Sequence, residues 1–244
     1  MSRVVRLISA FDREVPSMSL SGLAHRANLP LSTTHRLVEE LLGHGLIERL
    51  PTGRLRLGLR MWELASRGSH ALDLRETAVP FMQDVRAVVR QHTTLAVLDH
   101  GSVLYVERLS EPSSPLGSAN VAQRMPVHAS SSGLVLLAYA DAGFREQVLG
   151  SPLQQLTPET LVDPLVIRRH LTEIRERGYV ALHGAGVSEW TGIAVPVFGP
   201  GNQVVAALNI IAARNSVRTP AVLPSLLTAA HGISRALKDA PTLR

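Results

Sequence analysis

The sequence predicts an α+β protein of two domains, and three observations support this. Residues 1–60 contain three short amphipathic segments and a short alternating segment, residues 59–92 are mainly helical in pattern, and the remainder mixes strand-like and helical runs. The charge divides in the same way: residues 1–75 hold 11 Arg against 7 Asp and Glu, whereas the other 169 residues hold 14 basic and 13 acidic side chains. We therefore expect domains at 1–60 and 76–244, joined by a helical linker at 61–75.

The three N-terminal helices are identified by their apolar spacing and by residues that favour helix ends. Ser19 opens the second helix, and Ser32 is expected to cap the third. Gly43 and Gly45 provide the exit from the third helix, because glycine tolerates the left-handed conformation that follows many helices. The apolar positions of the three helices are, in turn, Val4, Val5, Leu7, Ile8 and Phe11; Leu20, Leu23 and Ala24; and Leu37, Val38, Leu41 and Leu42.

After Gly45 the apolar period changes from helical to alternating. The runs LIERL and RLRLG flank Pro51-Thr-Gly53 and predict a short β-hairpin. Arg54 and Arg56 alternate with leucines, so both are expected on one face of this hairpin. Three small helices followed by a basic hairpin is the element order of a winged helix-turn-helix.

The second domain is predicted to be α+β with a mainly antiparallel sheet. TLAVLD and SVLYVERL form an expected hairpin, and GYVAL, GIAVPVF and QVVAALNIIAA are expected strands. Pro80 is expected to start or kink a helix, and the Ser/Gly-rich stretch 110–120 is typical of a mobile loop. The expected helices are 132–140, 164–177 and 220–237.

The composition excludes several classes of protein. Hydrophobic residues make up 45% and charged residues 18%, which fits a globular chain, and no apolar run approaches the roughly 20 residues of a membrane span. There is no Cys, which excludes disulfides and thiol chemistry and is compatible with the cytoplasm. The ten His lack metal-ligand spacing, and the sequence has no G-x-S-x-G, H-E-x-x-H or phosphate-binding glycine loop. We therefore expect no catalytic residue, no metal and no cofactor.

The start of the third helix is a candidate surface for reading double-stranded DNA. Ser32, Thr33, His35 and Arg36 are short or hydrogen-bonding side chains, placed where the second helix of a helix-turn-helix comes closest to base edges. Ser and Thr at a helix start are more often caps, and paired arginines on a hairpin are more often a solvated face. The agreement of the helix order, the basic hairpin and the N-terminal charge favours DNA binding, with both hairpin arginines along the backbone or in the minor groove.

Four stretches that together span nearly the whole chain resemble one known family. LSTTHRLVEELLGHGLIER followed by LRLGLRMWELA is similar to a recognition helix, wing and linker, and MPVHASSSGLVLLAYA is similar to a loop and helix with a Pro-x-His-Ala core. TPETLVDPLVIRRHLTEIRERGY and GIAVPVFGPGNQVVAALNI resemble the last helix and strands of the same family, the IclR family of bacterial transcriptional regulators. The resemblance implies a GAF-like or profilin-like C-terminal domain that binds a small-molecule effector, often a carboxylic or aromatic acid. It also implies homodimers joined through the DNA-binding domains, and often homotetramers.

A polar cluster before the apolar run LVLLAYA is the candidate effector site read from the residues themselves. His128, Ser130, Ser131 and Ser132 precede that helix. Amides at a helix N-terminus can hold an anion or an oxygen-rich ligand, although such clusters mostly serve as caps. A nucleophile-and-base role for the same residues is disfavoured, because neighbours in sequence rarely align for it.

The resemblance adds Leu182, Gly192, Asn209 and Ile211 to the candidate effector site. Many members carry an acidic cluster where this chain has Leu-His-Gly-Ala at 182–185, and a Cys where it has Gly192. These departures imply a wider and more apolar pocket. Trp190 is a secondary candidate, more often a packing residue.

The resulting hypothesis is a cytoplasmic regulator, a homodimer or homotetramer, that binds a palindromic operator and responds to a small-molecule effector. One alternative is a small-molecule sensor or enzyme that uses the helix-turn-helix only for protein contacts. Another is a DNA-binding architectural protein without an effector. Ligand turnover without DNA affinity would favour the first alternative.

Overall fold

The chain divides into two compact units. A computed structural model describes residues 2–12, 14–67, 69–110 and 122–239. The units are Met1–His70 and Ala71–Arg244, so their boundary lies within the stretch expected to be a linker. The loop expected at 110–120 lies, apart from Ser110, outside the described residues.

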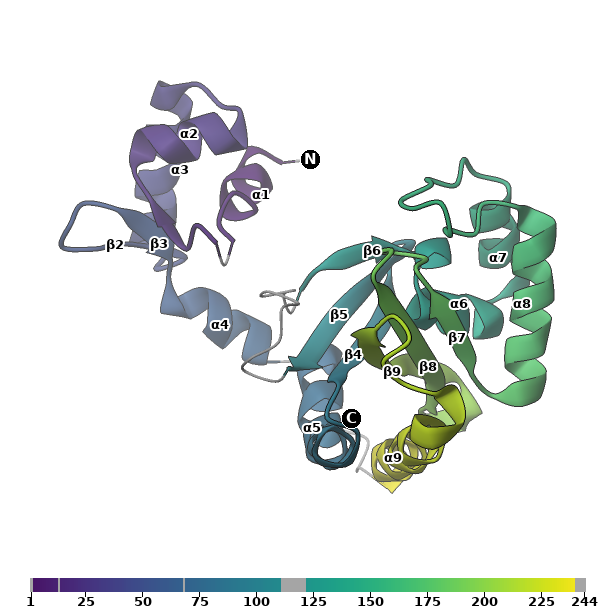
Figure 1. The fold of residues 1–244 in the computed structure, drawn as a ribbon. Coiled ribbons are helices and arrows are strands. Elements are labelled where there is room, and N and C mark those ends of the chain that lie inside the picture. Colours follow the sequence, from purple (N-terminus) through teal and green to yellow (C-terminus); the bar gives the residue numbers. More distant parts are fainter. Residues whose placement is uncertain (1, 13, 68, 111–121, 240–244) are drawn as a thin grey trace. The chain divides into compact units, whose positions relative to one another are not determined.

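The N-terminal unit packs three helices against a small sheet (Figure 1). Its strands form an antiparallel sheet in the order β1-β3-β2, and its core includes the fully buried Leu7, Leu23, Val38 and Leu55. The elements are α1 (Arg3–Ile8), β1 (Ser17–Met18), α2 (Leu20–Ala27), α3 (Leu31–Gly43), β2 (Ile47–Arg49), β3 (Leu55–Leu57) and α4 (Leu59–Ser66). This is the predicted winged helix-turn-helix, with β1 as a strand that the sequence pattern did not predict.

The ends of α2 and α3 follow local chemistry, with one correction. Ser19 caps α2 as predicted, since its hydroxyl accepts a hydrogen bond from the Gly22 amide at 3.1 Å. Ser32 does not cap α3: the Pro30 carbonyl already accepts the first helical hydrogen bond, at 2.9 Å, so the helix cap lies two residues earlier and Ser32 lies in the first turn. At the other end, Gly45 adopts a φ of 68° as predicted, which lets the chain turn back after the helix.

The C-terminal unit is an antiparallel sheet with helices on both faces. Within the described residues the sheet has six strands in the order β6-β5-β4-β9-β8-β7. One core cluster lies between the sheet and α6 and α8, and a second lies between the sheet and α5 and α9. The elements are α5 (His70–Val89), β4 (His92–Asp99), β5 (Ser102–Leu109), β6 (Arg124–Pro126), α6 (Ser131–Tyr139), α7 (Ala142–Leu149), α8 (Pro164–Arg177), β7 (Val180–His183), β8 (Trp190–Phe198), β9 (Val204–Ala213) and α9 (Thr219–Asp239), with 3-10 turns at Val127–Ala129 and Pro200–Asn202.

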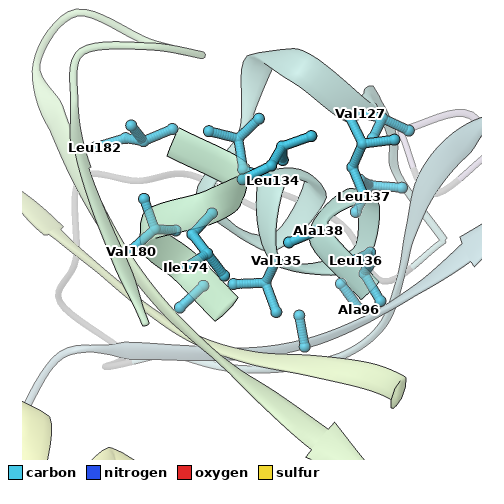
Figure 2. Packing of buried hydrophobic residues seen from close by; sticks show 14 of the residues in the cluster. Ala96, Val127, Leu134, Val135, Leu136, Leu137, Ala138, Ile174, Val180 and Leu182 are labelled. Carbon is cyan, nitrogen blue, oxygen red and sulfur yellow. The ribbon is translucent and has the colours of Figure 1, made fainter. Parts of the chain in front are cut away.

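Helix α6 is the central helix of this unit and is apolar all round. Its residues from Ser131 to Ala138 are all buried, because α6 is enclosed by the sheet on one side and α8 on the other. Figure 2 shows Leu134 and Val135 of α6 packed toward Ile174 of α8 and Val180 of β7. The N-terminus of α6 is thereby fixed against the sheet.

Most predicted elements of the second domain are confirmed, and the differences have local causes. The short β6 and the weakly amphipathic α7 carry little periodic signal, and the sequence reading missed both. Pro80 lies inside α5 and does not start a helix; the flanking Ala78 and Met82 are fully buried, so packing holds the helix through the proline. Within the described part of the chain, no helix is long and apolar enough to cross a membrane.

Candidate functional site

A cavity of about 150 Å³ opens in the C-terminal unit between one face of the sheet and the start of α6. Its wall is mainly apolar, with Met125, Leu182, Val187, Trp190 and Ile211 among its residues. The polar groups that line it are Thr94, Tyr105, Arg108, Gln123, Ser130, Ser131 and Asn209. A concave, mostly apolar space with a few polar groups is the usual form of a small-molecule site.

The polar groups on the sheet lie in one row across three strands. Thr94 of β4 is the register partner of both Arg108 on β5 and Asn209 on β9. The alternation within β5 is broken by a bulge opposite Leu95 and Ala96. This bulge brings Tyr105 and Arg108 to the cavity together, although strict alternation would put them on opposite faces.

Three buried side chains form a hydrogen-bonded chain along the cavity wall. The Ser131 hydroxyl donates to Asn209 Oδ1 at 3.0 Å, and Asn209 Nδ2 donates to Thr94 Oγ1 at 3.2 Å. Ser131, Asn209 and Thr94 are 4%, 1% and 1% exposed, and all three line the cavity. Any further hydrogen bond from these side chains must therefore be made to a molecule in the cavity.

Arg108 places a cation in this largely apolar site. Its Nε donates to Ser110 Oγ at 2.9 Å, whereas its Nη2 is buried and has no hydrogen-bond partner among the described residues. Burial lowers the pKa of the Arg108 guanidinium, which nevertheless stays charged, and burial raises the pKa of the neighbouring Tyr105 phenol, which stays neutral. A half-buried cation that forms no ion pair among the described residues attracts an anion.

The start of α6 is capped from within the chain. Ser130 accepts a hydrogen bond from the Gly133 amide at 3.0 Å, so for this serine the cap interpretation holds. His128 is buried and its Nε2 contacts the Gln154 carbonyl at 2.9 Å. Neither His128 nor Ser132 is among the described residues that line the cavity.

The loop 184–189 contributes Ala185, Gly186 and Val187 to the cavity wall and is held at several points. Thr157 Oγ1 donates to the Gly184 carbonyl at 2.7 Å, and Thr160 Oγ1 donates to the Ala185 carbonyl at 2.6 Å. Arg214 bonds both Glu159, at 2.8 Å, and the Ser188 carbonyl, at 3.2 Å. The hydrogen bond from Arg214 holds the pKa of the Glu159 carboxyl below its usual value.

Six of the eight predicted effector-site residues line the cavity: Ser130, Ser131, Leu182, Gly192, Asn209 and Ile211. The sequence reading missed Thr94, Tyr105 and Arg108. One signal was present for Arg108, since a Glu-Arg pair inside the apolar run SVLYVERL is unusual for a buried strand.

In the N-terminal unit, the predicted DNA-reading residues lie on the outer face of α3. Ser32, His35 and Arg36 are exposed and Thr33 is half-buried, while Leu37 and Val38 point into the core. The Arg36 side chain is 70% exposed and lies 3.9 Å from Glu40.

The two wing arginines are both exposed and both engaged within the unit. Arg54 Nε donates to Ser17 Oγ at 3.1 Å and also bonds the Ser17 carbonyl, and Arg56 forms an ion pair with Glu48. Arg54 and Arg56 flank the fully buried Leu55, so they lie on the same side of the wing.

Comparisons with known proteins agree with this architecture. Residues 1–51 match the family model "IclR helix-turn-helix domain", and residues 67–236 match "Bacterial transcriptional regulator IclR C-terminal". The chain is 26% identical over 212 residues to the HTH-type transcriptional regulator XynR of Escherichia coli (strain K12), covering 86% of this chain and 84% of XynR.

Among the solved structures that resemble this chain are two IclR homologs, each with 98% coverage of this chain and of its own chain. A crystal structure of an IclR homolog from Microbacterium hydrocarbonoxydans, complexed with 4-hydroxybenzoate, is 45% identical with a TM-score of 0.91. An IclR homolog from Microbacterium sp. strain HM58-2 is 44% identical with a TM-score of 0.64. With its winged helix-turn-helix and its cavity-bearing second unit, the chain belongs to the IclR family of bacterial transcriptional regulators, which bind DNA through the first domain and an effector through the second.

Proposed function

We propose that the effector of this regulator is an aromatic monocarboxylate whose carboxylate binds Arg108. The observation that carries the proposal is Arg108, which lines the mainly apolar cavity and whose buried Nη2 has no hydrogen-bond partner among the described residues. A guanidinium binds a carboxylate through charge-assisted hydrogen bonds, and the low dielectric of such a site strengthens them.

The size and lining of the cavity favour a single aromatic ring. An apolar cavity of about 150 Å³ is known to accept a benzene-sized molecule, and this cavity has about that volume. Trp190, Leu182 and Ile211 offer apolar contact to a ring, whereas a small aliphatic acid would leave much of that surface uncovered. The complex of a 45% identical relative with 4-hydroxybenzoate supports the same ligand class.

We infer that effector binding is transmitted through β5 to α5. Next to Arg108, the buried Glu107 faces the other side of the sheet and forms an ion pair with Arg75 of α5 at 2.6 Å. Ser110 bonds Arg108 through its hydroxyl, and its carbonyl accepts from Arg86 of α5 at 3.2 Å. A carboxylate that draws Arg108 toward the cavity changes the contacts of α5, the element that follows α4 in sequence.

On the DNA side, we propose that Ser32, Thr33, His35 and Arg36 face the major groove and that the wing arginines contact phosphates. The ion pairs of Arg36 with Glu40 and of Arg56 with Glu48 do not oppose this, because exposed ion pairs contribute only about 0–1 kcal/mol. Each arginine can therefore exchange its glutamate for a phosphate or a base edge at little cost.

A second copy of the chain is the proposed partner of α4. This helix, described in full, buries none of its residues, and Leu59 and Trp62 are 75% and 67% exposed. Apolar side chains on one short helix favour a homodimer that places two winged helices on a palindromic operator. We also propose that two such dimers form a homotetramer, and that the protein acts in the cytoplasm, where its operator lies, without catalytic activity.

Isothermal titration calorimetry tests the effector class. We expect benzoate and 4-hydroxybenzoate to bind, and pyruvate and uncharged benzamide to bind at least tenfold more weakly. If benzamide binds as tightly as benzoate, the site does not recognise the carboxylate. If pyruvate binds more tightly than benzoate, the site does not select an aromatic ring.

Fluorescence anisotropy with DNA from the gene's own upstream region tests the DNA surface. Arg36→Ala is expected to weaken binding by about 1–3 kcal/mol and to flatten sequence preference, whereas Arg3→Ala on α1 serves as a control. Absence of binding by the wild type at low salt would contradict the assignment of this region as operator.

A further inference from the structure

We propose that the cavity recognises a ring hydroxyl on its effector through the chain Ser131–Asn209–Thr94, and that Gly192 is the residue that allows this chain to form. The proposal rests on the aromatic effector proposed above and adds a second recognition element to it. It concerns the part of the wall that Arg108 does not occupy.

The hydrogen bonds within the Ser131–Asn209–Thr94 chain determine which donor and which acceptor remain for a ligand. Ser131 uses its proton on Asn209 Oδ1, so its oxygen is left as an acceptor toward the cavity. Thr94 accepts from Asn209 Nδ2, and its own proton has no acceptor among the described residues. If the Asn209 amide has the opposite orientation, Ser131 becomes the donor toward the cavity and Thr94 the acceptor. In either orientation one hydroxyl of the pair donates and the other accepts.

A hydroxyl group is the simplest partner for such a chain, because it donates one hydrogen bond and accepts another. A carboxylate only accepts and an unsubstituted ring edge does neither, so either would leave a buried polar group unsatisfied. A site built around a ligand hydroxyl discriminates strongly against the analogue that lacks it. We expect about a tenfold to hundredfold preference for the hydroxylated ring.

The placement of the chain defines where the hydroxyl lies on the ring. Arg108 and Asn209 flank Thr94 on successive strands, which puts their backbones roughly 10 Å apart. The carboxylate on Arg108 and the hydroxyl near Asn209 therefore occupy different ends of the ring. A hydroxyl next to the carboxylate, as in 2-hydroxybenzoate, bonds its own carboxylate and does not reach the chain.

Gly192 of β8 lies directly against this chain. A Cβ at this position would be 2.4 Å from Ser131 Oγ and 3.5 Å from Asn209 Oδ1. Any side chain there forces the Ser131 hydroxyl to rotate away, which breaks its bond to Asn209. Gly192 thus determines specificity without offering a polar group of its own.

Calorimetric titration of benzoate and 4-hydroxybenzoate tests the proposal. In the wild type, 4-hydroxybenzoate is expected to bind tenfold or more tightly than benzoate, and 2-hydroxybenzoate no better than benzoate. In Thr94→Val, Ser131→Ala and Gly192→Ala, the ratio of the Kd for benzoate to the Kd for 4-hydroxybenzoate is expected to fall toward one. The conservative Thr94→Ser should restore the ratio, which a merely structural role of Thr94 would not predict.

Thr93→Val is the matched control, because Thr93 is buried on the same strand and is absent from the described cavity lining. Its ratio is expected to equal that of the wild type. Equal binding of both acids by the wild type would overturn this inference and leave the proposed function intact. Failure of both acids to bind would overturn the proposed function itself.

Discussion

Replacing Arg108 with Met gives the sharpest test of the carboxylate site. Met has a similar length and is apolar, so the substitution keeps most of the volume while it removes the charge and the donors. A hydrogen bond to a charged group contributes about 1.5–3 kcal/mol. Arg108 is half-buried, so we discount the larger values for fully buried ion pairs and expect about 2–3 kcal/mol, roughly a 30-fold to 150-fold rise in the Kd of 4-hydroxybenzoate.

The hydrogen bond from Arg108 Nε to Ser110 is not counted in this change of binding free energy, because it is already present in the protein without ligand. The variant is expected to keep its melting temperature, since it loses a half-buried cation whose Nη2 has no hydrogen-bond partner among the described residues. Arg124→Met is the control, because Arg124 forms an exposed ion pair with Asp99 and is not among the described lining residues. Calorimetry in which Arg108→Met binds 4-hydroxybenzoate as tightly as the wild type would refute the carboxylate site.

Three further predictions concern the wing, the start of α6 and Glu159, whose partner Arg214 holds the loop 184–189. Removing both Arg54 and Arg56 is expected to reduce the slope of log affinity against log salt by about 1–2, with little change in sequence preference, as anisotropy at several salt concentrations will measure. Gly133→Ala is expected to lower the melting temperature by several degrees, because its Cβ would lie 2.0 Å from a backbone oxygen, whereas Gly143→Ala should not. The hydrogen bond from Arg214 lowers the pKa of the Glu159 carboxyl in the folded state. The ionised carboxyl therefore stabilises the fold at pH values above its pKa in the unfolded state, and this stabilisation is lost as the pH falls through its pKa in the folded state. The difference in melting temperature between wild type and Glu159→Gln should therefore be small at pH 7 and absent at low pH; a difference that grows on acidification would contradict the assignment.

Local chemistry made most of the fold predictable from the sequence. Apolar spacing and helix ends identified the three N-terminal helices, the wing and the main elements of the second unit. The start of α3 was predicted wrongly, since a serine in the first turn has the same sequence signature as a cap, and the short β1 and β6 and the weakly amphipathic α7 were not predicted.

The cavity was less predictable, because its polar groups depend on strand register. The bulge in β5 brings Arg108 to the same face as Tyr105, and a period-two reading assigns them to opposite faces. Thr94 lies between Arg108 and Asn209 because β4 pairs with both β5 and β9, and the sequence of β4 alone does not reveal this pairing. Ser131 and Asn209 were predictable because a polar helix start and an amide in an apolar strand stand out in the sequence alone.

The central claim is that an aromatic acid bound at Arg108 changes the affinity of the protein for its operator. The most direct test is anisotropy of labelled upstream DNA, titrated with protein in the absence and presence of saturating 4-hydroxybenzoate. A coupling of about 1–3 kcal/mol predicts a 5-fold to 150-fold change in the Kd for DNA, in either direction, and no change in Arg108→Met at the same ligand concentration. An unchanged Kd for DNA in a wild-type protein that calorimetry shows to be saturated with the acid would contradict the claim.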